Sequence, residues 1–94
     1  MMENIDKLGQ RLKKLRLERG LTLDMVVYDL QHKYGVVITK GNLSRWENNV
    51  NTPSLRLAAS LCLYYNISLD YLIGNTDTKA PVDLIMRTKR KENK

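Results

Sequence analysis

The side chains best suited to specific hydrogen bonding lie close together, in residues 39–49. Lys40 and Arg45 are cationic donors, and Asn42 carries an amide that both donates and accepts. In the major groove of DNA, arginine can form two parallel hydrogen bonds with guanine and asparagine can do so with adenine. Lysine can bind guanine or a phosphate group. The pattern therefore indicates contacts with a nucleic acid.

The same segment carries the signals of a short helix. Thr39 is a good N-cap, and Asn49 can adopt the left-handed conformation that often ends a helix. Leu43 and Trp46 fall on one face with Glu47 beside them, so we expect this face to be an anchor in the core. A core position for Trp46 is favoured over stacking on a base. The candidate base-contacting residues are Lys40, Gly41, Asn42, Ser44 and Arg45.

Each of these residues has a second interpretation. Arg45 can contact phosphate or solvent instead of guanine, and Asn42 can stabilise the first turn of its own helix. Gly41 would act through its lack of a side chain, which lets the helix approach DNA closely. Phosphate contacts are expected from helix ends and from the loop after the helix. The phosphate candidates are Thr22, Thr39, Asn49, Asn51, Thr52 and Arg56.

Four further helices are predicted around this segment. Apolar spacing predicts helices over 5–19 and from Thr22 to Gly35, with Asn4 and Thr22 as caps. Two more follow, one opening at Pro53-Ser54 and a short one over 69–73. The wide apolar face of the first of these is expected to include Leu55, Ala58, Ala59, Leu61, Cys62 and Tyr65. Val36-Val37-Ile38 is expected to be extended without forming a sheet.

The predicted fold is a compact all-α domain over residues 1–76, followed by a C-terminal extension over 77–94. A short helix is possible near 81–87, with Val82, Ile85 and Met86 on one stripe. That stripe would either pack on the domain or contact a second subunit. The basic end after it is expected to be disordered and to add non-specific attraction to phosphate.

Composition narrows the functional classes. The chain has a net charge of +6 and a pI near 9.6, which favours an anionic partner. Cys62 is the only cysteine, so an internal disulfide is excluded, and His32 has no other ligand at metal-binding spacing. No cofactor, no metal site and no enzymatic activity are expected, because no catalytic constellation is present. No apolar run is long enough to span a bilayer, and a cytoplasmic setting is expected.

Residues 5–74 resemble the lambda-repressor-like (Xre-type) helix-turn-helix domain family. The order and spacing of several short fragments carry the resemblance. They are Leu12-Lys13-Lys14-Leu15-Arg16, Arg19-Gly20-Leu21-Thr22, Ile38-Thr39, Leu43-Ser44-Arg45-Trp46-Glu47-Asn48, Pro53-Ser54 and Ile67-Ser68-Leu69-Asp70-Tyr71-Leu72.

The resemblance implies a five-helix fold in which the second and third helices form the helix-turn-helix. The third helix, Thr39–Asn48, would enter the major groove. The resemblance also implies a largely buried ion pair between Arg16 and Glu47. Two departures stand out: the segment around 31–37 is longer than usual, and Leu23 replaces a glutamine that often contacts phosphate in the family, so that contact is not expected.

The leading hypothesis is a sequence-specific regulator of transcription, a repressor, that binds double-stranded DNA. A homodimer on a pseudo-palindromic site is expected, because one helix reads few bases. One alternative hypothesis is an antitoxin or a restriction-system controller, which would bind DNA in the same way. The alternative from a different functional class is a protein-interaction module that has lost DNA binding.

Overall fold

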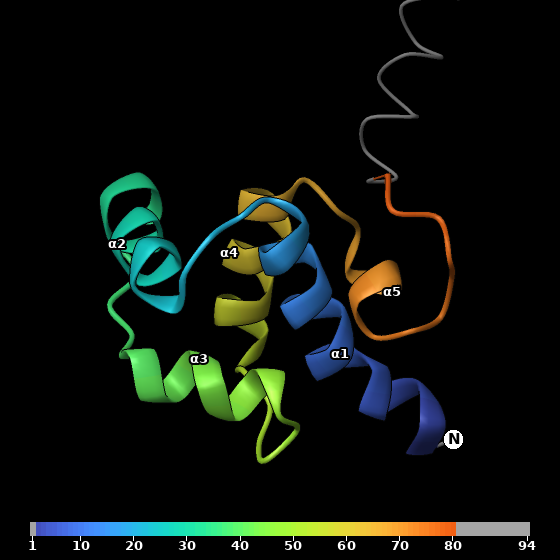
Figure 1. Cartoon of the computed structure of the whole chain (residues 1–94). Coiled ribbons are helices and arrows are strands. Elements are labelled where there is room, and N and C mark those ends of the chain that lie inside the picture. Colours follow the sequence, from blue (N-terminus) through green and yellow to red (C-terminus); the bar gives the residue numbers. More distant parts are fainter. Residues whose placement is uncertain (1, 81–94) are drawn as a thin grey trace, which may run out of the picture.

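The computed structural model describes residues 2–80, with side chains from residue 7 onward. The predicted helix near 81–87 and the basic end lie outside the described residues. Within residues 2–80 the chain forms five helices: α1 (Met2–Glu18), α2 (Leu23–Tyr34), α3 (Lys40–Glu47), α4 (Leu55–Tyr65) and α5 (Leu69–Leu72). In the described range there is no strand, and the all-α prediction is confirmed. Figure 1 shows α2 and α3 on one side of α1 and α5 on the other.

Local capping chemistry explains where four of the helices begin. The hydroxyl oxygens of Thr22, Thr39, Ser54 and Ser68 each accept a hydrogen bond from a backbone N–H three residues later. These bonds satisfy amides that the first turn leaves unpaired. The prediction of an N-cap at Asn4 is wrong, because α1 begins at Met2 and Asn4 lies inside the helix. Met2 and Glu3 are good helix formers, so the helix extends through them.

Helix ends follow from residues that tolerate a positive φ. Asn49 and Asn66 adopt φ values of 58° and 57°, and Gly35 caps α2 with a φ of 67°. Between Gly35 and Thr39 the side chains alternate: Val36 and Ile38 are buried and Val37 is exposed. This alternation is the pattern of an extended chain, so the predicted extended segment without a sheet is confirmed in the described range.

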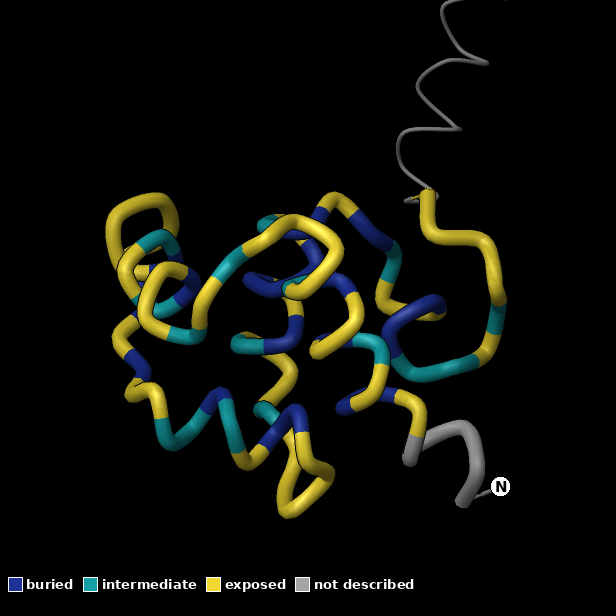
Figure 2. The backbone as a smooth tube through the Cα atoms, viewed as in Figure 1, coloured by how far each residue is buried: buried dark blue, intermediate teal, exposed yellow. Residues whose placement is uncertain are grey.

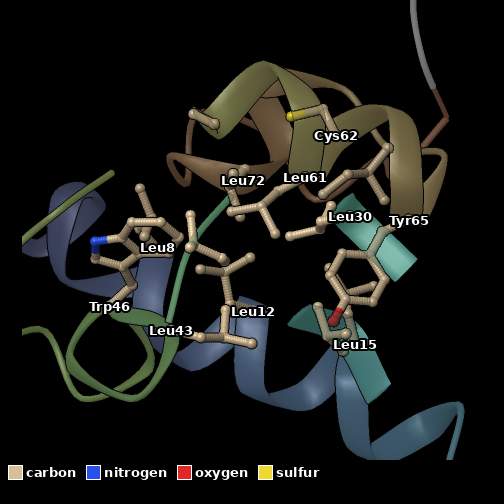
Figure 3. Close-up of a cluster of buried hydrophobic side chains, with 14 of the residues drawn as sticks. Leu8, Leu12, Leu15, Leu30, Leu43, Trp46, Leu61, Cys62, Tyr65 and Leu72 are labelled. Carbon is tan, nitrogen blue, oxygen red and sulfur yellow. The ribbon is translucent and has the colours of Figure 1, made fainter. Parts of the chain in front are cut away.

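The core draws apolar side chains from every helix. Leu12, Leu30, Leu43, Leu61 and Leu72 are each no more than 1% exposed. Figure 2 shows buried backbone (dark blue) recurring along the helices, and Figure 3 shows the side chains of these leucines in one cluster.

The predicted apolar face of α4 is partly wrong. Leu55 and Ala59 are exposed, because α4 turns only the opposite side toward α2 and α5. Cys62 is buried as expected, and burial raises the pKa of its thiol to about 11, so the thiol is protonated at neutral pH.

Arg11 connects α1 to the chain that follows α5. Its guanidinium donates to the carbonyl oxygens of Tyr71 and Thr76, and pairs with Asp77 at 2.8 Å. The N–H of Ser68 also donates to the carbonyl of Lys79 at 2.9 Å. Contacts with the domain therefore continue beyond residue 76, where the sequence predicted its boundary.

Gly9 allows α1 to approach the end of α3 closely. A Cβ at this position would lie 2.5 Å from the carbonyl oxygen of Trp46 and 2.5 Å from Oδ1 of Asn49. The Gly9 N–H donates to that Oδ1 at 3.0 Å. Sequence reasoning missed Gly9, although a glycine inside a helical pattern is a signal of close packing.

We expect Gly9→Ala to lower the free energy of unfolding by about 1–3 kcal/mol, because the backbone carbonyl of Trp46 cannot move away cheaply. This loss would outweigh the intrinsic gain in helix propensity of about 1 kcal/mol. Urea denaturation followed by circular dichroism measures the change. Gln10→Ala, at an exposed neighbouring position, is the control. An unchanged midpoint for Gly9→Ala would contradict this packing argument.

Candidate nucleic-acid interface

A mostly buried ion pair fixes α3 against α1. Nε of Arg16 lies 2.8 Å from Oε2 of Glu47, and its Nη2 lies 3.0 Å from Oε1. The side chains are 12% and 5% exposed. Nη1 of Arg16 also donates to the carbonyl of Leu21 at 2.9 Å, which ties in the connection before α2. The hydrogen bonds to Glu47 raise the pKa of Arg16 above its ordinary value, against the opposing effect of burial.

The inward face of α3 completes this attachment. Leu43 is 1% exposed and Trp46 is 5% exposed. Figure 3 shows both side chains in the cluster that contains Leu8 and Leu12 of α1. Trp46 therefore occupies the core and is not available to stack on a base.

The outward face of α3 presents two exposed cations, Lys40 and Arg45. A Cβ on Gly41 would lie 3.3 Å from Nη1 of Arg45, so the guanidinium lies over the first turn of the helix. The missing side chain at Gly41 thus leaves room for Arg45, a role that the sequence did not indicate. Ser44 is half-buried, and its carbonyl oxygen accepts from Nδ2 of Asn48 at 2.9 Å.

Asn42 takes part in the capping of its own helix. Its Oδ1 accepts from the N–H of Thr39 at 2.9 Å, while the Thr39 hydroxyl oxygen accepts from the N–H of Asn42 at 3.0 Å. Two-point recognition of adenine needs both the oxygen and the nitrogen of an asparagine amide. Asn42 would have to give up its capping bond to read adenine in that way.

The phosphate candidates fall into two groups. Thr22, Thr39, Asn51, Thr52 and Arg56 are exposed. The two threonine oxygens accept capping bonds, which leaves their hydroxyl hydrogens able to donate. Asn49 differs, because its Oδ1 accepts from Gly9 and faces α1.

Asp24 and Lys40 share an open groove between the C-terminal end of α1 and the first turns of α2 and α3. The groove has a volume of about 470 Å³, and Arg16, Gly20 and Thr22 are also among its lining residues. Nζ of Lys40 lies 3.7 Å from Oδ2 of Asp24, and the side chains are 63% and 75% exposed. The first turn of α3 contains no acidic residue, whereas Asp24 lies in the first turn of α2.

Two other kinds of feature, a membrane-spanning helix and a metal-binding cluster, are absent from the described residues. Over residues 2–80, no helix is both long enough and apolar enough to cross a membrane. In the same part of the chain, no three histidine, cysteine or carboxylate side chains gather in a way that could hold a metal ion.

Comparisons with known proteins agree with this arrangement. Residues 9–78 match a family described as a helix-turn-helix domain. The HTH-type transcriptional regulator ImmR of Bacillus subtilis (strain 168) is 32% identical over 83 residues, which cover 86% of this chain and 61% of that protein. The chain thus spans about 61% of the length of this relative. No solved structure matches the chain. The chain belongs to the helix-turn-helix domain family, in its Xre-type, lambda-repressor-like class.

We expect Arg16→Met to lower the free energy of unfolding by about 3 kcal/mol, because it leaves the carboxylate of Glu47 buried without its partner. The double variant Arg16→Met, Glu47→Leu should be more stable than Arg16→Met, since it removes the stranded charge. Lys13→Met, at an exposed position of α1, controls for the loss of a cation. Urea titrations of the parent, the two single variants Arg16→Met and Glu47→Leu, and the double variant measure the coupling free energy between the two residues. Strictly additive losses of stability would contradict a paired role.

Proposed function

We propose that this chain is a sequence-specific regulator of transcription that binds double-stranded DNA and places α3 in the major groove. The division of α3 into two faces carries the proposal. Leu43, Trp46 and Glu47 hold the helix to the core, and Lys40 and Arg45 remain exposed on the other side. Membership of the helix-turn-helix family supports it, as does a relative named as a transcriptional regulator.

Base reading is assigned first to Arg45 and Lys40. An arginine can bind the O6 and N7 atoms of guanine at once, and a lysine can bind either atom. Gly41 clears the space that Arg45 occupies, and Ser44 adds a small polar contact on the helix. Asn42 can also read adenine, but its side-chain amide must first break the capping hydrogen bond from the N–H of Thr39.

Phosphate binding is assigned to the ends of α3 and α4 and to the loop between them. The first turns of these two helices carry no acidic residue, so the positive end of each helix dipole is not neutralised locally. Thr39, Asn51, Thr52 and Arg56 are exposed there and can donate to phosphate oxygens. Thr22 remains a weaker candidate because Asp24 lies two residues away. Asn49 contributes by shaping the loop, since its side chain is turned toward α1.

A homodimer on a pseudo-palindromic site supplies the specificity that one short helix lacks. Two copies related by a two-fold axis would place their α3 helices about 34 Å apart, one turn of DNA. We propose that repression follows when the site lies in a promoter, because the bound protein excludes other proteins from the same DNA. The function requires no catalytic step.

The proposed contact between the two copies is the exposed stripe of α4. Leu55 and Leu63 are 74% and 66% exposed, and Ala59 is exposed between them. Residues four apart share one helix face, so these side chains form a continuous apolar stripe. An 11-residue helix is about 16 Å long, which is short for the roughly 1,200 Å² of a stable interface. The contact is therefore expected to be weak in solution and to form cooperatively on DNA.

We expect Arg45→Ala to relax base preference at one position in each half-site. The lost discrimination should be about 1–3 kcal/mol, the range for a two-point arginine–guanine contact. The DNA site is first obtained by in vitro selection, and every base pair in it is then substituted in turn. Fluorescence anisotropy on these duplexes measures the lost base discrimination.

The matched control for this experiment is Arg56→Ala. This change should weaken binding to all sequences alike. It should also make the plot of log K against log salt concentration (the salt slope) less steep by about 0.9, as expected for the loss of one phosphate contact. Base preference that is unchanged in Arg45→Ala would refute the assignment of Arg45.

We expect Leu63→Glu to reduce affinity for a two-half-site DNA by about tenfold, because the dimer would bury a charge against apolar surface. Affinity for a single half-site should stay the same. Tyr28→Glu is the control, since Tyr28 is similarly exposed, at 61%, on α2. Gel shifts on the two DNA lengths separate the effects, and equal cooperativity in both variants would exclude α4 as the dimer contact.

A further inference from the structure

Two helices of this protein begin with almost the same three residues. Thr22-Leu23-Asp24 opens α2 and Ser68-Leu69-Asp70 opens α5. In both, the hydroxyl residue caps the helix and the aspartate lies in the first turn. An aspartate in this position stabilises a helix through the helix dipole. That local role accounts for Asp70, which forms no ion pair within residues 7–80.

Asp24 has a neighbour that Asp70 lacks. Its Oδ2 lies 3.7 Å from Nζ of Lys40, the first residue of α3. The two side chains come from different helices and meet in the groove between the first turns of α2 and α3. Arg16 also lines this groove, but its guanidinium is engaged by Glu47 and by the Leu21 carbonyl. Lys40 is therefore the cation of the groove that Asp24 can neutralise.

The position of this pair matters because α3 is the helix proposed to enter DNA. A phosphate near the groove would be attracted by Lys40 and by the capped N-terminal turns of α2 and α3. The carboxylate of Asp24 opposes this attraction. Attraction to phosphate is independent of base sequence, and it supplies essentially all of non-specific binding but only a share of specific binding. A carboxylate here therefore removes a larger fraction of the binding free energy from unmatched DNA than from matched DNA.

The ion pair is also easy to exchange. Both side chains are more than half exposed, and ion pairs of this kind contribute little to stability. Lys40 can therefore leave Asp24 at small cost when a guanine presents O6 or N7 with the right geometry.

We propose that Asp24 is a specificity-determining residue of the DNA interface. It holds Lys40 in the free protein and repels phosphate from the groove, so Lys40 is transferred from Asp24 to a base edge on matched DNA. This inference rests on the proposed function, since it requires that α3 read DNA. Lys40 then supplies the attractive contact with matched DNA, and Asp24 supplies the repulsion of unmatched DNA. Attraction to the right partner and repulsion of the wrong one are the two means of discrimination.

The test compares Asp24→Asn with Asp70→Asn in the full chain. Both variants remove one negative charge from the first turn of a helix with a similar N-cap, so net charge and the loss of dipole stabilisation are matched. Fluorescence anisotropy would measure the affinity of each protein for a selected site and for a scrambled duplex across a salt series.

Asp24→Asn should bind the scrambled duplex about three- to tenfold more tightly than the parent protein. Its salt slope on that duplex should steepen by about 0.9, the value for one added phosphate contact. The ratio of specific to non-specific affinity should fall accordingly. Asp70→Asn should leave this ratio unchanged. In a Lys40→Met background the effect of Asp24→Asn should shrink, because the cation that Asp24 neutralises is gone.

Two results would overturn the inference while leaving the proposed function intact. One is an Asp24→Asn variant that behaves like Asp70→Asn on both duplexes. The other is an Asp24→Asn variant that gains the same factor on matched and scrambled DNA. A parent protein with no preference for any duplex would instead refute the proposed function, and the role of Asp24 with it.

Discussion

The ion pair between Arg16 and Glu47 is the interaction on which the arrangement of this domain depends. α3 has only eight residues, too few to be a stable helix in water without tertiary packing. Arg16 bonds the last residue of α3 and the connection between α1 and α2 at once. Because both charges are largely removed from water, either one alone would be costly, so the pair favours a single orientation of α3.

That orientation gives the two faces of α3 different roles. The buried face belongs to the core, and the polar residues at both ends of the helix are largely occupied with structure. Asn42 caps the start, and Asn49 shapes the exit while bonding α1. The exposed cations Lys40 and Arg45 are thus the side chains with the most freedom to meet a ligand. Asp24 adds a negative charge beside one of them, so the first turns of α2 and α3 differ electrostatically although both are capped by threonine.

The predictable parts of the fold were those that local chemistry decides. Thr22, Thr39, Ser54 and Ser68 cap their helices through bonds three residues away, and such signals are visible in the sequence. Leu43 and Trp46 share a face by helical spacing alone. The partnership of Arg16 with Glu47, 31 positions apart, needed the family resemblance as well.

The parts that the sequence could not supply depend on long-range packing. The Gly9 N–H meets Asn49 across 40 positions, and Arg11 reaches Asp77 across 66. A glycine inside a helical pattern signals close packing but does not identify the partner, and Arg11 looked like an ordinary surface charge. Leu55 and Ala59 looked like core residues because periodicity gives the width of an apolar face but not how much of it the neighbours cover.

In vitro selection of bound DNA from a random duplex library tests the central claim most directly. A short helix that reads the major groove in a two-fold dimer predicts enrichment of a pseudo-palindromic motif. Its half-sites should be centred about 10 base pairs, or one helical turn, apart. A library that shows no enriched motif after repeated rounds, while the protein remains folded, would contradict the account.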